Sequence, residues 1–300
     1  MFYENWMDYI VDDAKITKIA IPGAHNACTK GMVVMGCCQN GTPLEQYEYG
    51  VRKFGIRFKN TKKGIRIAHG ISNGMSAEEA FSYFAEILGK YNDFIILDIR
   101  AYGPQKFGPF TMSYGDDPEA ISRLIEKYLQ PEKYALTEFD DIRDVTLGDI
   151  KKSGKRYVIH SEKEEYVYSR DVKLLEPWDM KVFGYKPEKF SVECLKYLRD
   201  MESEGFFWFQ SQQTPNPGTE IGLTWPKKLD ELDRPYFAPM MATIAGDRKM
   251  LEKVNIVAGD FMTRDHMKEN EILYLNLCKG IVKPEMAEEY AETIGRSLPH

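Results

Sequence analysis

Residues 16–26 read ITKIAIPGAHN, a run of apolar and β-branched residues that stops at Pro22 and then delivers His25. A run of this kind is typical of a buried strand, and the Pro-Gly pair that ends it places the histidine at the strand's carboxyl end. Residues 65–70 read IRIAHG and repeat the arrangement with His69. Two predicted strands therefore each deliver an imidazole where they end.

Outward from these strands, apolar segments alternate with helical ones along the chain. Further strands are expected at 55–58, 94–100, 156–160, 206–210 and 255–261, and helices at 42–54, 77–91, 117–129, 146–152, 191–201, 247–253 and 272–279. Such alternation, with a polar residue ending each strand, is typical of a parallel α/β barrel. The direct step from the strand at 55–58 to the strand at 65–70 is not a regular βα unit. The sequence therefore predicts a single distorted or incomplete TIM (β/α)8 barrel over residues 1–300.

The composition narrows the classes of function. A formal net charge of -6 at pH 7 argues against a nucleic-acid binder, which usually shows a basic balance or stripe. Five cysteines without a Cys-x-x-Cys pair argue against a zinc site. The sequence contains no apolar run of about 18 residues that could cross a membrane, and no leader of the signal-peptide type. We expect a cytoplasmic protein if Met1 is the native start, and a secreted one if a signal peptide has been removed.

Two histidines at strand ends suit acid–base catalysis of phosphoryl transfer. One imidazole can remove a proton from an attacking hydroxyl while the other protonates the leaving oxygen, because the histidine pKa lies near neutrality. Asp260 can orient one imidazole, and Lys62 or Arg57 can stabilise charge on the phosphoryl oxygens. A single histidine is more often a packing residue, so the prediction rests on the pair. The residues expected to gather at the mouth are His25, Asn60, Lys62, His69, Arg100, His160, Gln210 and Asp260.

Several stretches resemble the phosphatidylinositol-specific phospholipase C X-domain family. Residues 21–26, IPGAHN, resemble its first signature, and GIR at 55–57 followed by IAHG at 67–70 resembles its second. Residues 76–100 resemble the helix and strand that come next, and 255–261 resemble a late strand. The resemblance thins over the middle of the chain. Its specificity comes from the order and spacing of the two histidine signatures.

The resemblance implies a bacterial-type, metal-independent phospholipase C. His25 would be the general base for the inositol 2-hydroxyl, His69 the general acid for the diacylglycerol oxygen, and Asp260 the residue that orients His25. The products would be diacylglycerol and a cyclic inositol phosphate. Lys62 falls where metal-free relatives carry an arginine and calcium-dependent ones an acidic ligand. Calcium takes six or more oxygen ligands, carboxylates among them, and the corresponding positions here are Asn60, Lys62 and Arg100. We therefore expect no metal and no cofactor.

The chain also departs from the family pattern. Asn26 stands beside the first histidine where metal-free relatives carry a carboxylate that supports the second one, and an amide cannot raise the basicity of an imidazole in that way. The alternatives are therefore a catalytically weak or inactive relative that binds a phosphorylated head group, and a phosphodiesterase for another head group. The candidate substrate-binding residues are Asn26, Arg57, Asn60, Arg100, Tyr185 and Trp178.

The expected partner is a phospholipid or another inositol phosphodiester. We expect transient contact with a membrane surface through an aromatic rim, with Trp225 and Tyr236 in a Pro-rich loop at 215–240 as its candidates. Residues 31–36, GMVVMG, follow the first histidine and form either a lid over the pocket or an ordinary packed loop. The sequence sets no oligomeric state.

Overall fold

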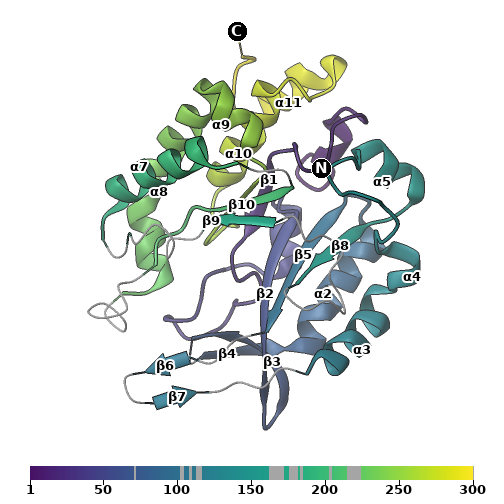
Figure 1. The fold of residues 1–300 in the computed structure, drawn as a ribbon, viewed down its shortest axis with the longest axis vertical. Coiled ribbons are helices and arrows are strands. Elements are labelled where there is room, and N and C mark those ends of the chain that lie inside the picture. The colour runs from purple at the N-terminus through teal and green to yellow at the C-terminus, as the bar shows by residue number, and fades with distance from the viewer. Residues whose placement is uncertain are drawn as a thin grey trace.

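The computed structural model describes residues 1–70, 72–101, 105–107, 110–112, 117–161, 172–175, 182, 185–202, 205–214 and 224–299. Over these residues the chain forms a nine-stranded sheet that curls into part of a barrel, with helices outside it (Figure 1). A separate two-stranded sheet consists of β6 (Gln105–Phe107) and β7 (Phe110–Met112). The predicted α/β class and incomplete barrel are confirmed, and the single-domain organisation stays a prediction.

β1 (Ile21–Ala24) joins the beginning of the chain to its end. It pairs in parallel with β11 (Ile256–Gly259) on one side and with β2 (Lys53–Thr61) on the other. The strand expected to begin at residue 16 forms a ladder only over its last part, although the residues before it are buried too. The register aligns Ala24 with Gly259, so the residues that follow these two strands leave the sheet side by side.

The remaining parallel strands follow the chain order around the barrel, as this fold requires. Beyond β2 come β5 (Ile95–Ala101) and β8 (Tyr157–His160). Beyond β11 come β10 (Phe206–Gln210) and β9 (Val172–Leu175). Within the described residues no ladder joins β8 to β9, so this part of the sheet is curled but open.

β2 runs past the parallel sheet and turns back as an antiparallel hairpin. β3 (Gly64–His69) pairs with β2, and β4 (Ser72–Ser76) pairs with β3. The tip of the hairpin projects from the lower end of the molecule in Figure 1. The predicted irregular β-β step is confirmed, and the returning strand delivers His69 to the carboxyl end of the parallel sheet.

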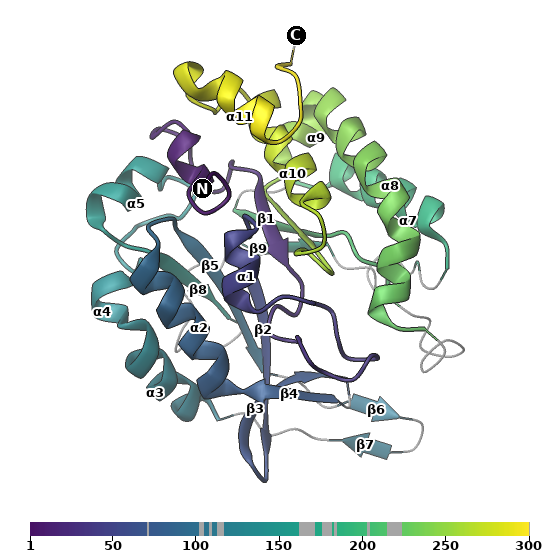
Figure 2. The ribbon, with the colours of Figure 1, turned by 180° about the vertical axis from the view of Figure 1, so that it is seen from behind.

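Helices cover the outer face of the sheet (Figure 2). The helices are α1 (Pro43–Glu48), α2 (Ala77–Lys90), α3 (Pro118–Leu129), α4 (Pro131–Tyr134), α5 (Leu147–Ser153), α7 (Pro187–Asp200), α8 (Pro226–Gly246), α9 (Arg248–Lys253), α10 (Met267–Cys278) and α11 (Ala287–Thr293), with short 3-10 turns at Trp6–Tyr9 and Pro284–Met286. Ser76 caps the beginning of α2, because its hydroxyl accepts from the Glu79 N–H at 3.1 Å. Among the described helices, none combines the length and the apolar character that crossing a bilayer requires.

Two expected boundaries are wrong. The helix expected at 42–54 ends at Glu48, because Gly50 adopts a φ of 103° and the apolar residues that follow belong to β2. The loop expected at 215–240 contains most of α8, which holds Pro235 and Pro239 in its interior. Interior prolines usually disfavour a helix, but α8 packs against α7 and α10, and this tertiary packing outweighs the local preference.

Alternation along the strands separates two buried apolar clusters. Ile95 and Leu97 of β5 pack with the helix residues of one cluster, whereas Ile96 belongs to the other, which fills the amino-terminal half of the barrel. The second cluster also contains Trp208 of β10. Because side chains alternate with a period of two, Asp98 follows Ile96 on the interior face. The carboxyl half of the barrel interior is therefore polar.

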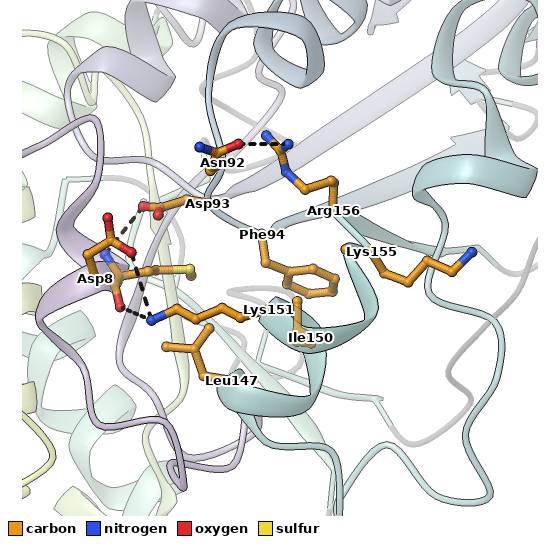
Figure 3. Close-up of a pocket in the computed structure, with 11 residues that line it drawn as sticks. Asp8, Asn92, Asp93, Phe94, Leu147, Ile150, Lys151, Lys155 and Arg156 are labelled. Carbon is orange, nitrogen blue, oxygen red and sulfur yellow. Dashed lines mark hydrogen bonds and ion pairs between the residues drawn. The ribbon is translucent and has the colours of Figure 1, made fainter.

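A pocket lies at the opposite end, where β5 and β8 begin (Figure 3). It is formed by residues of the first 3-10 turn, of α5 and of the segments that lead into the two strands, including Met7, Asp93, Phe94, Ile150 and Arg156. Histidine is absent from its lining. The acid–base residues therefore belong to the other end of the barrel.

Candidate active site

His25 and Asp260 meet because their strands are neighbours. His25 follows β1, Asp260 follows β11, and the parallel register places the two residues opposite each other. His25 Nδ1 lies 2.8 Å from Asp260 Oδ1, and the His25 N–H donates to the Gly259 carbonyl at 3.0 Å. Their side chains are 15% and 5% exposed. The structure thus brings together two residues separated by 235 positions in the sequence.

Buried charges behind Asp260 hold it in place. Lys268 Nζ donates to the Asp260 carbonyl at 2.6 Å and forms a buried ion pair with Asp230. Burial raises the pKa of the Asp260 carboxyl to about 7, while Lys268 opposes this rise and Asp230 adds to it. A carboxyl with a pKa near neutrality can share a proton with the imidazole beside it, so the two groups titrate as a pair.

Asn26 occupies the other nitrogen of the His25 ring. Asn26 has a left-handed φ of 47°, and its Nδ2 lies 3.0 Å from His25 Nε2. An amide nitrogen is a donor, so Nε2 carries the lone pair and the Nδ1–H donates to Asp260. His25 is therefore held in the neutral tautomer that a general base needs, with Asn26 resting on its basic nitrogen.

His69 reaches the same place from the end of β3. The centroids of the two imidazoles lie 6.1 Å apart, and the ring planes are inclined by 87°. His69 Nδ1 is 3.1 Å from the Gly36 carbonyl, which accepts its hydrogen and directs Nε2 away from that backbone. The Cys38 Sγ lies 3.5 Å from the same Nδ1. The two histidines thus share one site, although their catalytic roles stay predictions.

The surroundings of His69 keep it neutral in the unliganded protein. Burial, together with the positive charges of His25 and Arg57, lowers the pKa of His69 to about 4. A general acid must carry a proton, so His69 needs an anion close by to restore its basicity. A bound phosphodiester supplies such a charge.

Arg57 provides a cation beside the histidines. It lies half-buried on β2, and the parallel register sets it next to Arg100 of β5. Alternation along β2 places Arg57 on the same face as Lys53, which contacts Asp98 and the Trp208 ring inside the barrel. A guanidinium can contact two oxygens of one phosphate.

The polar interior of the barrel continues below this group. Lys53 Nζ donates to Asp98 at 3.1 Å, and Arg100 Nε donates to the same carboxylate at 2.8 Å. Burial would raise the pKa of Asp98, but Lys53 and Arg100 outweigh it and hold the pKa below its usual value. Trp208 forms the floor, with Lys53 Nζ 4.3 Å from its ring centroid and the His160 ring 4.9 Å away.

Lys62 and Asn60 do not join this site, contrary to the sequence-based expectation. Lys62 is exposed in the turn between β2 and β3, and Asn60 is exposed near the end of β2. A strand rises about 3.3 Å per residue, so Lys62 lies roughly 16 Å beyond Arg57 along the hairpin. Arg57, the other cation considered from the sequence, is half-buried on β2.

The aromatic candidates lie elsewhere or outside the described residues. Tyr185 is 40% exposed, and its hydroxyl accepts from Thr224 Oγ1 at 2.7 Å near the beginning of α8. Trp178 lies outside the described residues. Trp225 is the N-cap residue before α8, and Tyr236 lies within that helix rather than in the loop expected at 215–240.

The loop at residues 31–36 lies against the site. Its last carbonyl, that of Gly36, accepts from His69, and the three residues before it are among the most exposed apolar side chains described. Val33 is 63% exposed, Val34 54% and Met35 41%. Gly36 has no room for a side chain, because a Cβ there would lie 2.8 Å from Ser72 Cβ. The loop therefore presents an apolar tip directly beside His69.

Sequence reasoning missed four residues of the site. Lys53 falls in the helix expected at 42–54 and Asp98 in the strand expected at 94–100, so neither is predicted as a site residue. Two-residue alternation from Arg57 and from Arg100 places both on the interior faces of their strands. Cys38 and Gln39 follow the first histidine by more than ten residues, and no spacing rule links such a loop to a strand end.

Comparison with known proteins identifies the fold. No protein-family model and no curated protein sequence matches the chain. The structure of phosphatidylinositol-specific phospholipase C from Listeria monocytogenes matches with a TM-score of 0.69 at 15% identity, covering 91% of this chain and 98% of that chain. A pentafluoro-Phe form of the Staphylococcus aureus enzyme gives a TM-score of 0.69 at 15% identity, covering 91% and 97%. Another S. aureus structure, concerned with membrane binding, gives 0.67 at 15% identity with the same coverage.

These matches define a class by fold. The chain has the TIM-type barrel of the bacterial phosphatidylinositol-specific phospholipases C, and the similarity extends over nearly the whole length of those enzymes. The residues that cluster at the mouth of this barrel are the evidence for its chemistry.

Proposed function

We propose that the chain is a phosphodiesterase of the phospholipase C type that cleaves an inositol phospholipid. The observation that carries the proposal is the facing pair of imidazoles, His25 held by Asp260 and His69 at a centroid distance of 6.1 Å. The fold match to phosphatidylinositol-specific phospholipases C supports the substrate class.

The proposed reaction is an intramolecular displacement at phosphorus. His25 Nε2 takes the proton of the inositol 2-hydroxyl, whose oxygen attacks the phosphorus. The bond from phosphorus to the glycerol oxygen breaks, and that oxygen receives a proton from His69. The products are a cyclic inositol phosphate and diacylglycerol. The reaction leaves His25 protonated and His69 neutral. Proton exchange with water returns both histidines to their starting states.

Arg57 stabilises the phosphoryl oxygens in this scheme. Its guanidinium is already beside the histidines, so the charge does not have to be assembled during the reaction. The phosphate in turn raises the basicity of His69 and loads it with the proton that it later donates. We expect the reaction to need no metal, because this cation occupies the role of one.

The polar interior suits a head group rich in hydroxyls. Lys53, Asp98 and Arg100 offer charged donors and acceptors, and Trp208 offers a flat apolar surface beside them. Sugar-like rings bind to such combinations, because hydroxyls need directional partners and the ring faces are apolar. The cluster therefore favours a polyhydroxylated head group over choline or ethanolamine.

The exposed loop tip gives the enzyme a way to meet a membrane. Val33, Val34 and Met35 are apolar, exposed and adjacent to the loop carbonyl that holds His69. Shallow burial of such side chains in a lipid interface would bring the site to the head groups. Val34→Asp is expected to reduce cleavage of vesicles while leaving that of a water-soluble substrate nearly unchanged.

A catalytically weak head-group binder is the second candidate, and Asn26 favours it. The Asn26 amide contacts the nitrogen that the base would use, at 3.0 Å, and it must move or be displaced before His25 accepts a proton. In that case the protein binds inositol phosphates and releases no cyclic product.

Product analysis tests the proposal. Purified protein is incubated with phosphatidylinositol vesicles, with and without a chelator, and cyclic inositol phosphate is followed by phosphorus NMR. Phosphatidylcholine vesicles are the matched control, because choline carries no hydroxyl placed for internal attack. We expect cyclic product from the first vesicles only, and equally with chelator. Binding of inositol phosphate without turnover would support the second candidate, and neither binding nor turnover would overturn both.

A further inference from the structure

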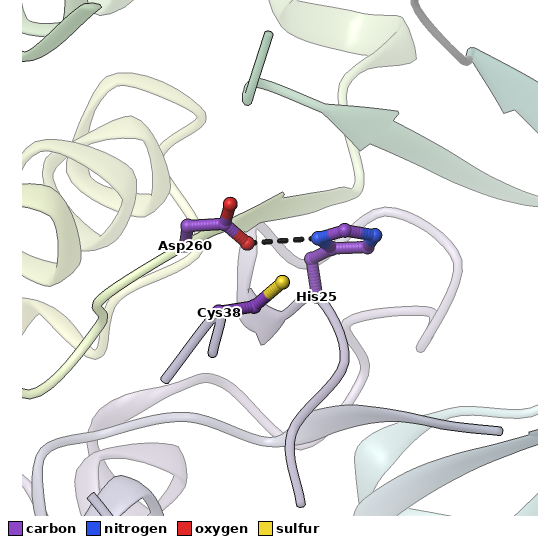
Figure 4. Close-up of side chains that lie close together, drawn as sticks. All are labelled: His25, Cys38 and Asp260. Carbon is purple, nitrogen blue, oxygen red and sulfur yellow. Dashed lines mark hydrogen bonds and ion pairs between the residues drawn. The ribbon is translucent and has the colours of Figure 1, made fainter. Parts of the chain in front are cut away.

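Cys38 lies inside the candidate site, and its thiol completes a cluster of three different donors. A ring nitrogen of His25, the Sγ of Cys38 and a carboxylate oxygen of Asp260 all lie within 4.8 Å of one another. Figure 4 shows the three side chains converging, with the thiol pointing toward the His25–Asp260 pair. Cys38 is 0% and Asp260 3% exposed, so solvent competes little for these donors.

A buried amide holds the three segments in this arrangement. Gln39 Nε2 donates to the His25 carbonyl at 2.8 Å and to the Gly259 carbonyl at 2.9 Å. The Phe261 N–H donates to the Cys38 carbonyl at 2.9 Å. Both neighbours of Asp260 are thus tied to the loop that carries Cys38, and the donors are positioned by the backbone before any ligand arrives.

The donor set matches one class of ion. Zinc bonds to sulfur at about 2.3 Å and to imidazole nitrogen or carboxylate oxygen at about 2.0–2.2 Å, so its ligand atoms lie roughly 3.3–3.7 Å apart. The three donors need only small movements to reach that spacing. Calcium and magnesium take oxygen ligands in larger number, which one carboxylate does not supply. Thiolate and imidazole together favour a thiophilic divalent ion.

We propose that His25, Cys38 and Asp260 form a binding site for a thiophilic divalent cation of the Zn²⁺ class, and that occupation of this site switches the catalytic pair off. The ion takes the three protein donors and leaves one position for water or for a phosphate oxygen. Coordination by His25 Nδ1, the nitrogen that faces Asp260, moves the imidazole proton from Nδ1 to Nε2. Coordination by Cys38 releases the thiol proton to solvent, and no redox step is involved. Its removal by a chelator restores the starting state.

The inhibition follows from the residues that are shared. Asp260 and His25 cannot orient and accept the proton of a substrate hydroxyl while their lone pairs bind an ion. This consequence rests on the proposed function, whereas the binding itself rests on the geometry of the three donors. The two parts can therefore be tested apart.

The chain supplies its own control in Cys37. Cys37 is the adjacent residue, half-buried, and its thiol donates to the Gln39 carbonyl at 3.3 Å. It is not a member of the three-donor cluster. Substituting it changes the number of thiols by one without touching the proposed site.

Cd²⁺ is the probe for the binding step, because a thiolate bound to Cd²⁺ gives an ultraviolet charge-transfer band. Metal-free wild type, Cys38→Ser and Cys37→Ser are titrated, with near-ultraviolet circular dichroism as the check on folding. We expect one equivalent of Cd²⁺ to develop the band in wild type and Cys37→Ser but not in Cys38→Ser. Zn²⁺ should displace the ion, whereas Ca²⁺ and Mg²⁺ should not. An equal band in folded Cys38→Ser, or its loss in Cys37→Ser alone, would overturn the site.

If Cys38→Ser does not fold, the Cd²⁺ titration of wild type alone tests the site. No band at one equivalent, or equal displacement by Ca²⁺, would refute the site. In the activity arm, Zn²⁺ should inhibit wild type and Cys37→Ser reversibly, and Cys38→Ser should need at least about tenfold more, since loss of even an outer-shell partner costs that much in metal affinity. Binding without any lipid cleavage would sink the proposed function and leave the metal site standing. Cleavage that Zn²⁺ leaves unaffected would sink the switch.

Discussion

Two buried charge pairs stand at opposite ends of the barrel strands. Arg52 precedes β2 and pairs with Asp93 ahead of β5, with Arg52 Nη2 at 2.8 Å from Asp93 Oδ2. At the other end His25 pairs with Asp260, also at 2.8 Å. In distance and in burial of the carboxylate the two pairs are nearly alike, yet only the second lies at a site with the means for chemistry.

The difference lies in what else each cation contacts. Arg52 is 0% exposed, stacks 3.7 Å above the Tyr47 ring, and gives its remaining hydrogens to backbone carbonyls. The accepting carbonyls are those of Tyr3, Glu4, Tyr47 and Val51. His25 instead directs Nε2 to the side-chain amide of Asn26, at 3.0 Å, at the carboxyl end of the strands. A buried guanidinium whose hydrogens bind a carboxylate and backbone carbonyls stabilises the fold, whereas an imidazole with a basic nitrogen at the carboxyl end of the strands can accept a proton.

The largest effect is expected from removing the His25 imidazole. His25→Ala should lower kcat/KM on phosphatidylinositol by about 10²–10⁴, the usual contribution of a general base. Circular dichroism and thermal unfolding check that the variant is folded. His266→Ala is the matched histidine control, because His266 stacks between Tyr3 and Tyr49 away from the site. Equal losses of kcat/KM in His25→Ala and His266→Ala would contradict a specific role for His25.

At the Arg52–Asp93 pair a loss of stability is expected, without a loss of activity. Asp93→Ala leaves the Arg52 charge buried without its partner and should reduce the free energy of unfolding by about 3–5 kcal/mol. Urea unfolding followed by circular dichroism measures this. The kcat of the folded fraction at low temperature should equal that of wild type. A stable protein that has lost activity would mean that the pair at the amino end serves the reaction.

Arg57 and Lys62 allow two cations of one hairpin to be compared, one half-buried on β2 and one exposed in the turn. Arg57→Gln should lower kcat by about 10²–10³, the usual cost of one donor to a developing negative charge. Lys62→Gln, five residues further along the hairpin, should leave kcat within experimental error. Steady-state kinetics of the two variants on a soluble substrate gives the answer. A large loss in Lys62→Gln with a small one in Arg57→Gln would restore the sequence-based assignment.

The smallest effect is a displacement of the pH profile. Because burial and the charges of His25 and Arg57 lower the pKa of His69 to about 4, one limb of the kcat/KM profile should lie near that value. An unshifted histidine would place it near about 6.5. Removing a positive charge favours the protonated ring, so Arg57→Gln should move this limb to higher pH. Movement to lower pH would show that Arg57 does not face His69.

Part of the fold and of the site could be predicted from the sequence, because local patterns identify strands that end in a histidine. Strands that end in a histidine were visible because an apolar run followed by Pro-Gly or Gly has a direct structural meaning. Assigning the late strand at 255–261 to the same barrel brought Asp260 to the mouth, whereas its pairing with His25 in particular was implied by the family resemblance. The irregular step after residue 58 gave the incomplete barrel.

The errors arose where tertiary contacts override local signals. The length of the β2–β3 hairpin was not readable, so Lys62 was counted toward the mouth although the turn carries it away. Prolines at 235 and 239 favoured a loop, but packing against α7 and α10 holds α8 together. Gln39 ties the loop that carries Cys38 to the carbonyls of His25 and Gly259, a contact that no spacing pattern encodes.

The pairing of β1 with β11 determines when the His25–Asp260 pair can form during synthesis. His25 and Asp260 are separated by 235 positions, and neither is oriented until β1 and β11 have paired. Asp260 is translated after His25, so the pair can form only once β11 has been synthesised.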